Sequence, residues 1–141
     1  MAVAGAVNVD IGGRSAGPLV GRDSNPGTVT VSMGGVGRNI AHNLRMLGVK
    51  VSLLTALGED PNAGLVTESC QRLGIDLSRA LHVPGGTTSS YLFLSDETGD
   101  MVLAVSDMDI YEKLTPAYFA HNQGFLNGAS LVVADANLPA E

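Results

Sequence analysis

The sequence predicts an α/β protein in which a parallel sheet with flanking helices is joined to a second, smaller sheet. Segments predicted to be buried strands, such as 49–57 and 131–134, alternate with segments of helical periodicity, which is typical of parallel strands joined by crossover helices. Three further segments, near residues 28–33, 89–94 and 101–105, are predicted strands that suit a sheet with one solvated face. The two patterns together predict two separate sheets.

The first half of the chain contains two predicted helices with clear ends. Val3–Ile11 is predicted to be a buried strand ended by glycines, and residues 14–27 a loop. Apolar residues at helical spacing predict a helix over residues 36–47, which Gly48 stops. Asp60 and Pro61 are a cap and a first residue for a second helix that runs to about Leu73 and ends at Gly74.

The strands and the helix of the second half of the chain are predicted from shorter sequence patterns. Residues 80–83 form a short apolar strand, and the strands at 89–94 and 101–105 form a hairpin around the turn at 96–100. Thr115 caps a predicted helix that runs from Pro116 to about residue 127. A buried strand follows at 131–134, and residues 137–139 resemble the entry to another helix.

Composition narrows the classes of function. The 141 residues are 45% hydrophobic and carry a net charge of −6 without a basic cluster, so nucleic acid is not an expected partner. No apolar segment approaches the roughly 20 residues of a membrane-spanning helix. The single cysteine, Cys70, favours a reducing compartment, and we expect a cytoplasmic protein. The three histidines lie on different predicted elements, so no metal site is expected.

A glycine cluster, Gly34-Gly35-Val36-Gly37, lies where a strand meets the first helix. One interpretation is a tight turn without a ligand. Another is a dinucleotide fingerprint, with an acidic residue about twenty positions later, although Ile40 stands where that motif needs a small residue. The third is a sugar or nucleoside site, in which backbone amides at the helix start and the Asn39 side chain hold hydroxyl groups.

Asn8 and Asp10 favour the third interpretation. They lie two residues apart, on one face of the first predicted strand and at its carboxyl end, which is where ligands bind in α/β sheets. An ionised carboxylate accepts hydrogen bonds from neighbouring hydroxyl groups. Taken alone, Asp10 could equally form a turn before the glycines that follow it.

These segments resemble the amino-terminal signature of the ribokinase (PfkB) family. The resemblance is carried by Asn8-Val9-Asp10, by the segment 34–41 from Gly34 to Ala41, and by Gly48 and Gly58, and it extends over the whole chain. Within the family the chain is most similar to the pseudouridine kinases, through segments 23–27, 37–41, 88–91 and 107–110.

The resemblance implies a ribokinase-like parallel sheet with flanking helices and a small β lid, of which residues 1–141 are the amino-terminal part. It implies substrate-binding roles for Asn8, Asp10, Gly34, Gly35 and Asn39, with Asn25 and Tyr91 as further candidates from the loop and the lid. Asn137 stands where ribokinases carry an acidic residue that contacts the sugar, and this change puts that contact in doubt.

The resemblance also implies an activity for the full-length protein. It would transfer the γ-phosphate of ATP to the 5′-hydroxyl of a ribosyl nucleoside, with pseudouridine as the first candidate. The catalytic aspartate and most of the sites for ATP, Mg²⁺ and a candidate monovalent cation belong to the family's carboxyl-terminal half. Thr98-Gly99-Asp100 lacks the glycine and the helix of that catalytic motif. We therefore expect this chain to be inactive alone, and the full-length protein to be a homodimer joined through its lids.

The sequence is also compatible with other functions. Ribokinase or another nucleoside kinase is the alternative within the family. A non-catalytic ligand-binding fragment and a nicotinamide-dependent oxidoreductase are the alternatives outside it.

Overall fold

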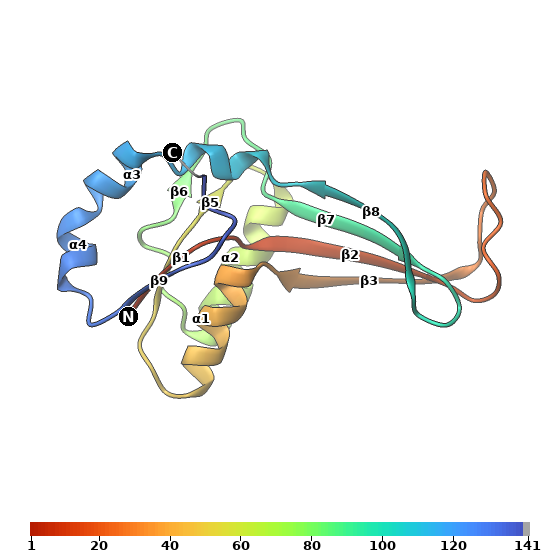
Figure 1. Cartoon of the computed structure of the whole chain (residues 1–141), viewed down its shortest axis with the longest axis horizontal. Coiled ribbons are helices and arrows are strands. Elements are labelled where there is room, and N and C mark those ends of the chain that lie inside the picture. The colour runs from red at the N-terminus through yellow and green to blue at the C-terminus, as the bar shows by residue number, and fades with distance from the viewer. Residues whose placement is uncertain (140–141) are drawn as a thin grey trace.

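Three short parallel strands form the centre of the body of the protein (Figure 1). In the computed structural model, which describes residues 1–139, β1 (Ala2–Ala4) lies between β4 (Ser52–Leu54) and β9 (Val132–Ala134). Val3 is paired with Leu53 on one side and Val133 on the other. The predicted parallel sheet is therefore present, and alternate residues of its strands face opposite layers of helices.

One layer consists of the two predicted long helices. α1 (Val36–Met46) and α2 (Pro61–Leu73) pack against Val3 and Leu53 in the main hydrophobic core. The Asp60 side chain accepts a hydrogen bond from the Ala63 amide at the start of α2, and Gly74 ends it in the left-handed conformation with φ 67°. Both predicted ends of α2 are confirmed.

The opposite layer corrects the sequence prediction of one helix over residues 116–127. The chain forms α3 (Pro116–His121) and α4 (Gln123–Gly128), which contact Ala2, Ala4 and Leu54 from the other face. Asn122 separates them because its side chain is buried and donates to the Tyr118 carbonyl at 3.0 Å instead of pointing to solvent. A 3₁₀ helix, η1 (Asp109–Lys113), precedes this layer.

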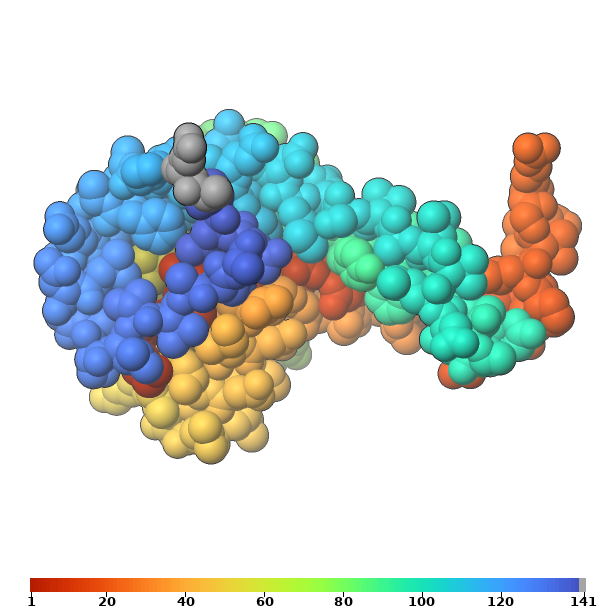
Figure 2. All heavy atoms as spheres, viewed as in Figure 1, coloured from red at the N-terminus to blue at the C-terminus, as the bar shows by residue number. Residues whose placement is uncertain are grey.

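The second sheet projects from the body as a long arm (Figures 1 and 2). Its order is β3 (Gly27–Gly34), β2 (Asn8–Ser15), β7 (Ser90–Ser95) and β8 (Met101–Asp107). The three predicted strands are confirmed as members of one sheet. β2 is an additional member, and it shortens the predicted loop because residues 14, 15 and 27 belong to strands.

The predicted strand Val3–Ile11 is wrong as a single element. The chain breaks at residues 5–7, so β1 belongs to the body and β2 to the projecting sheet. Asn8 and Asp10 therefore lie at the beginning of β2, just beyond the carboxyl end of β1. They still lie at the predicted edge of the parallel sheet, although on a different strand.

The two remaining strands form a small separate sheet. β5 (Ala56–Leu57) runs parallel to β6 (Leu81–His82), and Thr55 separates β5 from β4 within the segment that was predicted as one strand. Among residues 1–139, no helix has both the length and the apolar character needed to cross a bilayer.

Candidate functional site

A hollow of about 230 Å³ lies where the projecting sheet joins the body. Its walls come from the segments that follow β1 and β9, from the start of α1 and from β7. The parallel arrangement of β1 and β9 brings their carboxyl ends to one edge, which is the usual ligand position in such sheets. Six residues predicted from the sequence line it: Asn8, Asp10, Gly35, Asn39, Tyr91 and Asn137.

Asn8 and Asp10 form the polar floor of this hollow. Asn8 is 4% exposed, and its side-chain amide donates to Asp10 Oδ1. Burial raises the pKa of the Asp10 carboxyl, while the Asn8 hydrogen bond and the positive charge of Arg38 oppose that shift. The Asp10 carboxylate is thus stabilised by Asn8 and Arg38, and its oxygens can accept hydrogen bonds at the hollow.

Gly34 supports Asp10 and is not among the residues that line the hollow. It is paired with Asn8 across the sheet, and a Cβ on it would lie 2.2 Å from Asp10 Oδ2. Glycine therefore leaves the space that the carboxylate occupies. The sequence prediction placed the Gly34 amide against the ligand, whereas the geometry gives this residue a supporting position.

The amides at the start of α1 differ from expectation. The Gly37 amide donates to Asp135 Oδ2 at 2.8 Å, the Arg38 amide to the Ala6 carbonyl, and the Asn39 amide to the Gly35 carbonyl. These groups are used within the protein and do not face a ligand. Within residues 1–139, no hydrogen bond starts from the Gly35 or Val36 amide, and both residues line the hollow.

Asp135 is a residue that the sequence analysis missed. Its carboxylate accepts from the amides of Ala6 and Gly37, each at 2.8 Å, and from the Asn137 amide at 2.9 Å. It therefore joins the end of β9 to the break after β1 and to the positive end of the α1 dipole. The only local signal was an acidic residue directly after a buried strand.

Tyr111 is a second residue of this kind. Its hydroxyl accepts from the Val7 amide at 2.8 Å and donates to the Val7 carbonyl, which fixes the chain where β1 ends. Burial raises the pKa of this phenol. The 104 positions between the two partners leave no local sequence signal for the contact.

The two weaker candidates for substrate binding, Tyr91 and Asn25, lie in different parts of the projecting sheet. Tyr91 lies beside Asp10 across the β2–β7 pairing, and its hydroxyl donates to Met101 Sδ at 3.4 Å. Asn25, by contrast, bonds the backbone of Val20 at the far end of the hairpin. At about 3.3 Å per residue, the length of β2 places it roughly 20 Å from Asn8. Within one chain the structure does not bring Asn25 to the other candidates.

The dinucleotide interpretation does not fit this geometry. Gly35 and Gly37 follow β3, which is an antiparallel strand of the projecting sheet. A dinucleotide fingerprint follows a parallel strand of the central sheet. Instead, the glycines let α1 approach the break after β1, since a Cβ on Gly35 would lie 2.4 Å from the Ala6 carbonyl oxygen.

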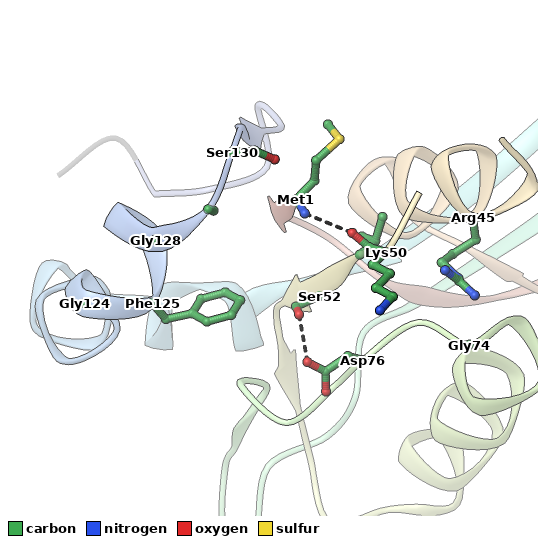
Figure 3. A pocket seen from close by; sticks show the side chains of 12 residues that line it. Met1, Arg45, Lys50, Ser52, Gly74, Asp76, Gly124, Phe125, Gly128 and Ser130 are labelled. Carbon is green, nitrogen blue, oxygen red and sulfur yellow. Dashed lines mark hydrogen bonds between the residues drawn. The ribbon is translucent and has the colours of Figure 1, made fainter. Parts of the chain in front are cut away.

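A larger hollow, of about 910 Å³, opens at the opposite end of the parallel strands (Figure 3). Its polar groups already hold the structure together. The Met1 ammonium donates to the Lys50 carbonyl, Ser52 to Asp76, and Arg45 to the carbonyls of Leu73 and Val49. None of the predicted substrate-binding residues lies there, so we place the candidate site at the smaller hollow.

No group of three or more His, Cys, Asp or Glu side chains among residues 1–139 is arranged to hold a metal ion. The smaller hollow is lined by hydrogen-bonding groups of several kinds. A carboxylate accepts, side-chain amides donate and accept, and two backbone amides donate. This set matches a small ligand with several hydroxyl groups.

Comparison with known proteins identifies the family. The whole chain, residues 1–141, matches the pfkB family of carbohydrate kinases. The chain belongs to this family. It is 42% identical to a pseudouridine kinase of Escherichia coli over 99% of the chain and 44% of that relative, and 30% identical to a guanosine-inosine kinase of Exiguobacterium acetylicum over 98% of the chain and 46% of that relative.

The fold of this pfkB family member is also that of solved ribokinases. An Arabidopsis thaliana ribokinase, solved with ribose and ATP, superposes with a TM-score of 0.83 at 19% identity, covering 98% of this chain and 45% of that one. The predicted ribokinase-like fold is confirmed. The chain spans less than half the length of each of these relatives.

Proposed function

We propose that the smaller hollow binds the ribosyl part of a nucleoside, and that the full-length protein transfers the γ-phosphate of ATP to its 5′-hydroxyl. Pseudouridine is the proposed acceptor. The observation that carries this proposal is the convergence of Asp10 and Asn39 on one hollow at the carboxyl edge of the parallel sheet. The 42% identity to a pseudouridine kinase supports the choice of acceptor.

Each wall of the hollow has a proposed role toward the sugar. Asp10 accepts hydrogen bonds from ribosyl hydroxyls, because an ionised carboxylate is the strongest acceptor available there. The side-chain amides of Asn39 and Asn8 form hydrogen bonds with the same hydroxyl groups. The Gly35 and Val36 amides offer two further donors, and Tyr91 and Asn137 close the sides.

The remaining parts of the reaction are assigned to the rest of the protein. We propose that residues 1–141 are the amino-terminal part of a ribokinase-like domain and that the projecting sheet acts as its lid. ATP, Mg²⁺ and a monovalent cation would be bound mainly by sequence beyond residue 141, together with the catalytic aspartate. On this proposal the isolated chain has no kinase activity. Cys70 is a free, buried thiol, in keeping with the proposed cytoplasmic location.

We propose further that the lid joins two copies of the full-length protein. The sheet register places apolar side chains of β3, β7 and β8 on the face opposite Asp10. Val29 and Val31 are 75% and 57% exposed there, and Leu103 and Val105 are similarly exposed. An exposed apolar face of this kind is typical of an interaction surface.

Two alternative functions would use the same hollow. A kinase for free ribose or for another nucleoside would use the same hydroxyl contacts, and the similarity to a guanosine-inosine kinase favours keeping the nucleoside class open. A non-catalytic protein that binds a ligand would use them without phosphoryl transfer.

A thermal-shift comparison of pseudouridine, uridine, ribose and adenosine on the full-length protein separates these functions, followed by an ATP-dependent phosphorylation assay. The proposal predicts the largest stabilisation by pseudouridine and its conversion to a 5′-phosphate. Stabilisation by ribose alone would favour a ribokinase. Binding without conversion would favour the non-catalytic alternative, and no stabilisation by any of the four would overturn the site assignment.

A further inference from the structure

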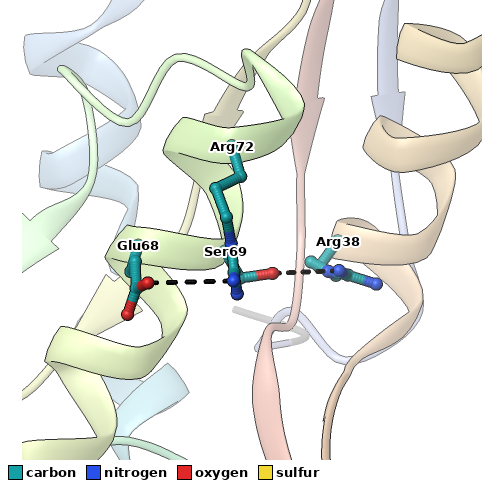
Figure 4. Close-up of polar contacts among 4 residues, drawn as sticks. All are labelled: Arg38, Glu68, Ser69 and Arg72. Atoms are coloured by element: carbon teal, nitrogen blue, oxygen red, sulfur yellow. Dashed lines mark hydrogen bonds and ion pairs between the residues drawn. The ribbon is translucent and has the colours of Figure 1, made fainter.

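Arg38 lies in the first turn of α1 and links it to α2 (Figure 4). Its Nη2 donates to Ser69 Oγ at 3.1 Å, and Ser69 is 7% exposed. The guanidinium is therefore held by a buried hydroxyl group of α2. This contact fixes the position of the guanidinium relative to the helix start.

The second terminal nitrogen of Arg38 contacts a residue of the candidate site. Nη1 donates to Asn39 Oδ1 at 3.2 Å. A guanidinium carries only donors, so the carbonyl oxygen of the Asn39 amide faces it and the Nδ2 group turns away. The opposite orientation would place two sets of donors against each other. Asn39 lines the hollow together with Asp10.

We propose that Arg38, held by Ser69, is a positioning residue that fixes the Asn39 amide so that its Nδ2 group is free to donate to the bound nucleoside. This inference rests on the proposed function. When it is ionised, Asp10 accepts hydrogen bonds but cannot donate them, whereas a sugar hydroxyl both donates and accepts. A fixed donor beside Asp10 therefore complements it, and fixing it before binding lowers the entropy lost on binding.

Two further observations support this role. The Arg38 Nε atom is buried and has no hydrogen-bond partner among residues 1–139, which is costly for a side chain that would serve stability alone. The positive charge of Arg38 also lowers the pKa of Asp10 against the effect of burial, which favours the ionised carboxylate.

The test measures KM for the nucleoside and kcat in the full-length enzyme for Arg38→Ala, Ser69→Ala and Asn39→Ala. Arg72→Ala is the matched control, because Arg72 is an exposed arginine of α2 whose ion-pair partner within residues 1–139 is Glu68 (Figure 4). We expect the Arg38 and Ser69 variants to raise KM roughly three- to tenfold, the effect of one hydrogen bond. kcat should change less than about twofold, and the control should match the wild-type enzyme.

The double variant Arg38→Ala/Asn39→Ala gives the sharper result. If Arg38 acts through Asn39, the double variant has the KM of Asn39→Ala alone. Additive effects, or Arg38 and Ser69 variants that behave like Arg72→Ala, would overturn the inference. If thermal unfolding shows that Arg38→Ala does not fold, Ser69→Ala and Arg38→Lys decide, since lysine keeps the charge without the planar fork and should also raise KM.

The same set separates this inference from the proposed function. An Asn39→Ala variant with unchanged KM and kcat would contradict the nucleoside site itself. A raised KM for Asn39→Ala with unchanged values for Arg38→Ala and Ser69→Ala would contradict only the positioning role.

Discussion

At the scale of single residues, Asp10 gives the site a dependence on pH. Burial raises its pKa above the ordinary value of 3.8, so the carboxylate is protonated at a higher pH than an exposed aspartate as the solution is acidified. Because the proposed contact needs the ionised form, affinity for pseudouridine should fall as the pH decreases through this raised pKa. Calorimetric titrations of the full-length protein between about pH 4 and pH 7 measure the effect.

The control for this titration is Asp10→Asn, which cannot ionise and should give weak binding with a flat profile over the same range. A wild-type profile that is equally flat, with undiminished affinity at the acid end, would contradict the role of the Asp10 charge.

Tyr111 gives a prediction about stability. Replacing it with phenylalanine leaves the amide and carbonyl of Val7 without their buried partner. Each unsatisfied buried group costs about 1–3 kcal/mol, so the free energy of unfolding should fall by about 2 kcal/mol or more. Denaturant unfolding of the full-length protein measures this.

Tyr118→Phe is the comparison for Tyr111→Phe. The Tyr118 hydroxyl donates to the Arg79 carbonyl, at 2.7 Å, in an exposed contact that water can replace. Its loss should cost clearly less. Equal losses in the two variants would show that the break after β1 does not depend on the Tyr111 hydroxyl.

At the scale of elements, the junction between β3 and α1 depends on Gly35. Its φ of 92° is unfavourable for other residues, and a Cβ would lie 2.4 Å from the Ala6 carbonyl oxygen and 2.5 Å from Val7 Cα. Since both neighbours are backbone atoms, Gly35→Ala must displace either α1 or the chain after β1. Gly48→Ala is the control, because Gly48 has a φ of 80° with open space around it.

Gly48→Ala should therefore show only the cost of the left-handed conformation, about 1–2 kcal/mol. Gly35→Ala should lose more than this in denaturant unfolding and should also weaken nucleoside binding. If the two alanine variants were equally stable, the close approach of α1 to the break after β1 would have no energetic weight.

The elements also show how far the sequence could predict this fold. The ends of α2 were predictable because Asp60, Pro61 and Gly74 act on their own neighbours in the chain. The break at residues 5–7 was not, because Tyr111 and Asp135 impose it from more than a hundred residues away. Local patterns therefore predicted helices and strands well, and failed where distant side chains hold the backbone.

The candidate site shows the same division. Asn8, Asp10 and Asn39 could be predicted because their residue types and the adjoining glycines form a recognisable pattern. The use of the α1 amides by Asp135 and by the Ala6 carbonyl could not, because it depends on how β9 and the segment after β1 meet α1.

At the scale of the whole molecule, the apolar face of the projecting sheet predicts self-association of the full-length protein. Val31 and Leu92 both pair with Ile11, so they share this face. Val31→Asp should place a charge in the proposed interface and convert a dimer to a monomer. Light scattering coupled to size-exclusion chromatography gives the mass directly.

Thr28→Asp is the matched control for Val31→Asp, because Thr28 belongs to the same strand but pairs with Arg14 on the opposite face. It should leave the mass unchanged. A monomeric wild-type protein, or a Val31→Asp variant that remains dimeric, would contradict the proposed lid interface.

The most direct test of the account is the affinity of full-length Asp10→Asn for pseudouridine at neutral pH, measured by calorimetry beside the wild-type protein. Asp100→Asn, in the β7–β8 turn, serves as a control for the loss of one negative charge. A hydrogen bond to a charged group contributes about 1.5–3 kcal/mol, so we predict that Asp10→Asn binds at least about tenfold more weakly while Asp100→Asn binds normally. An Asp10→Asn variant that binds pseudouridine as tightly as the wild-type protein would contradict the claim that this carboxylate holds the sugar.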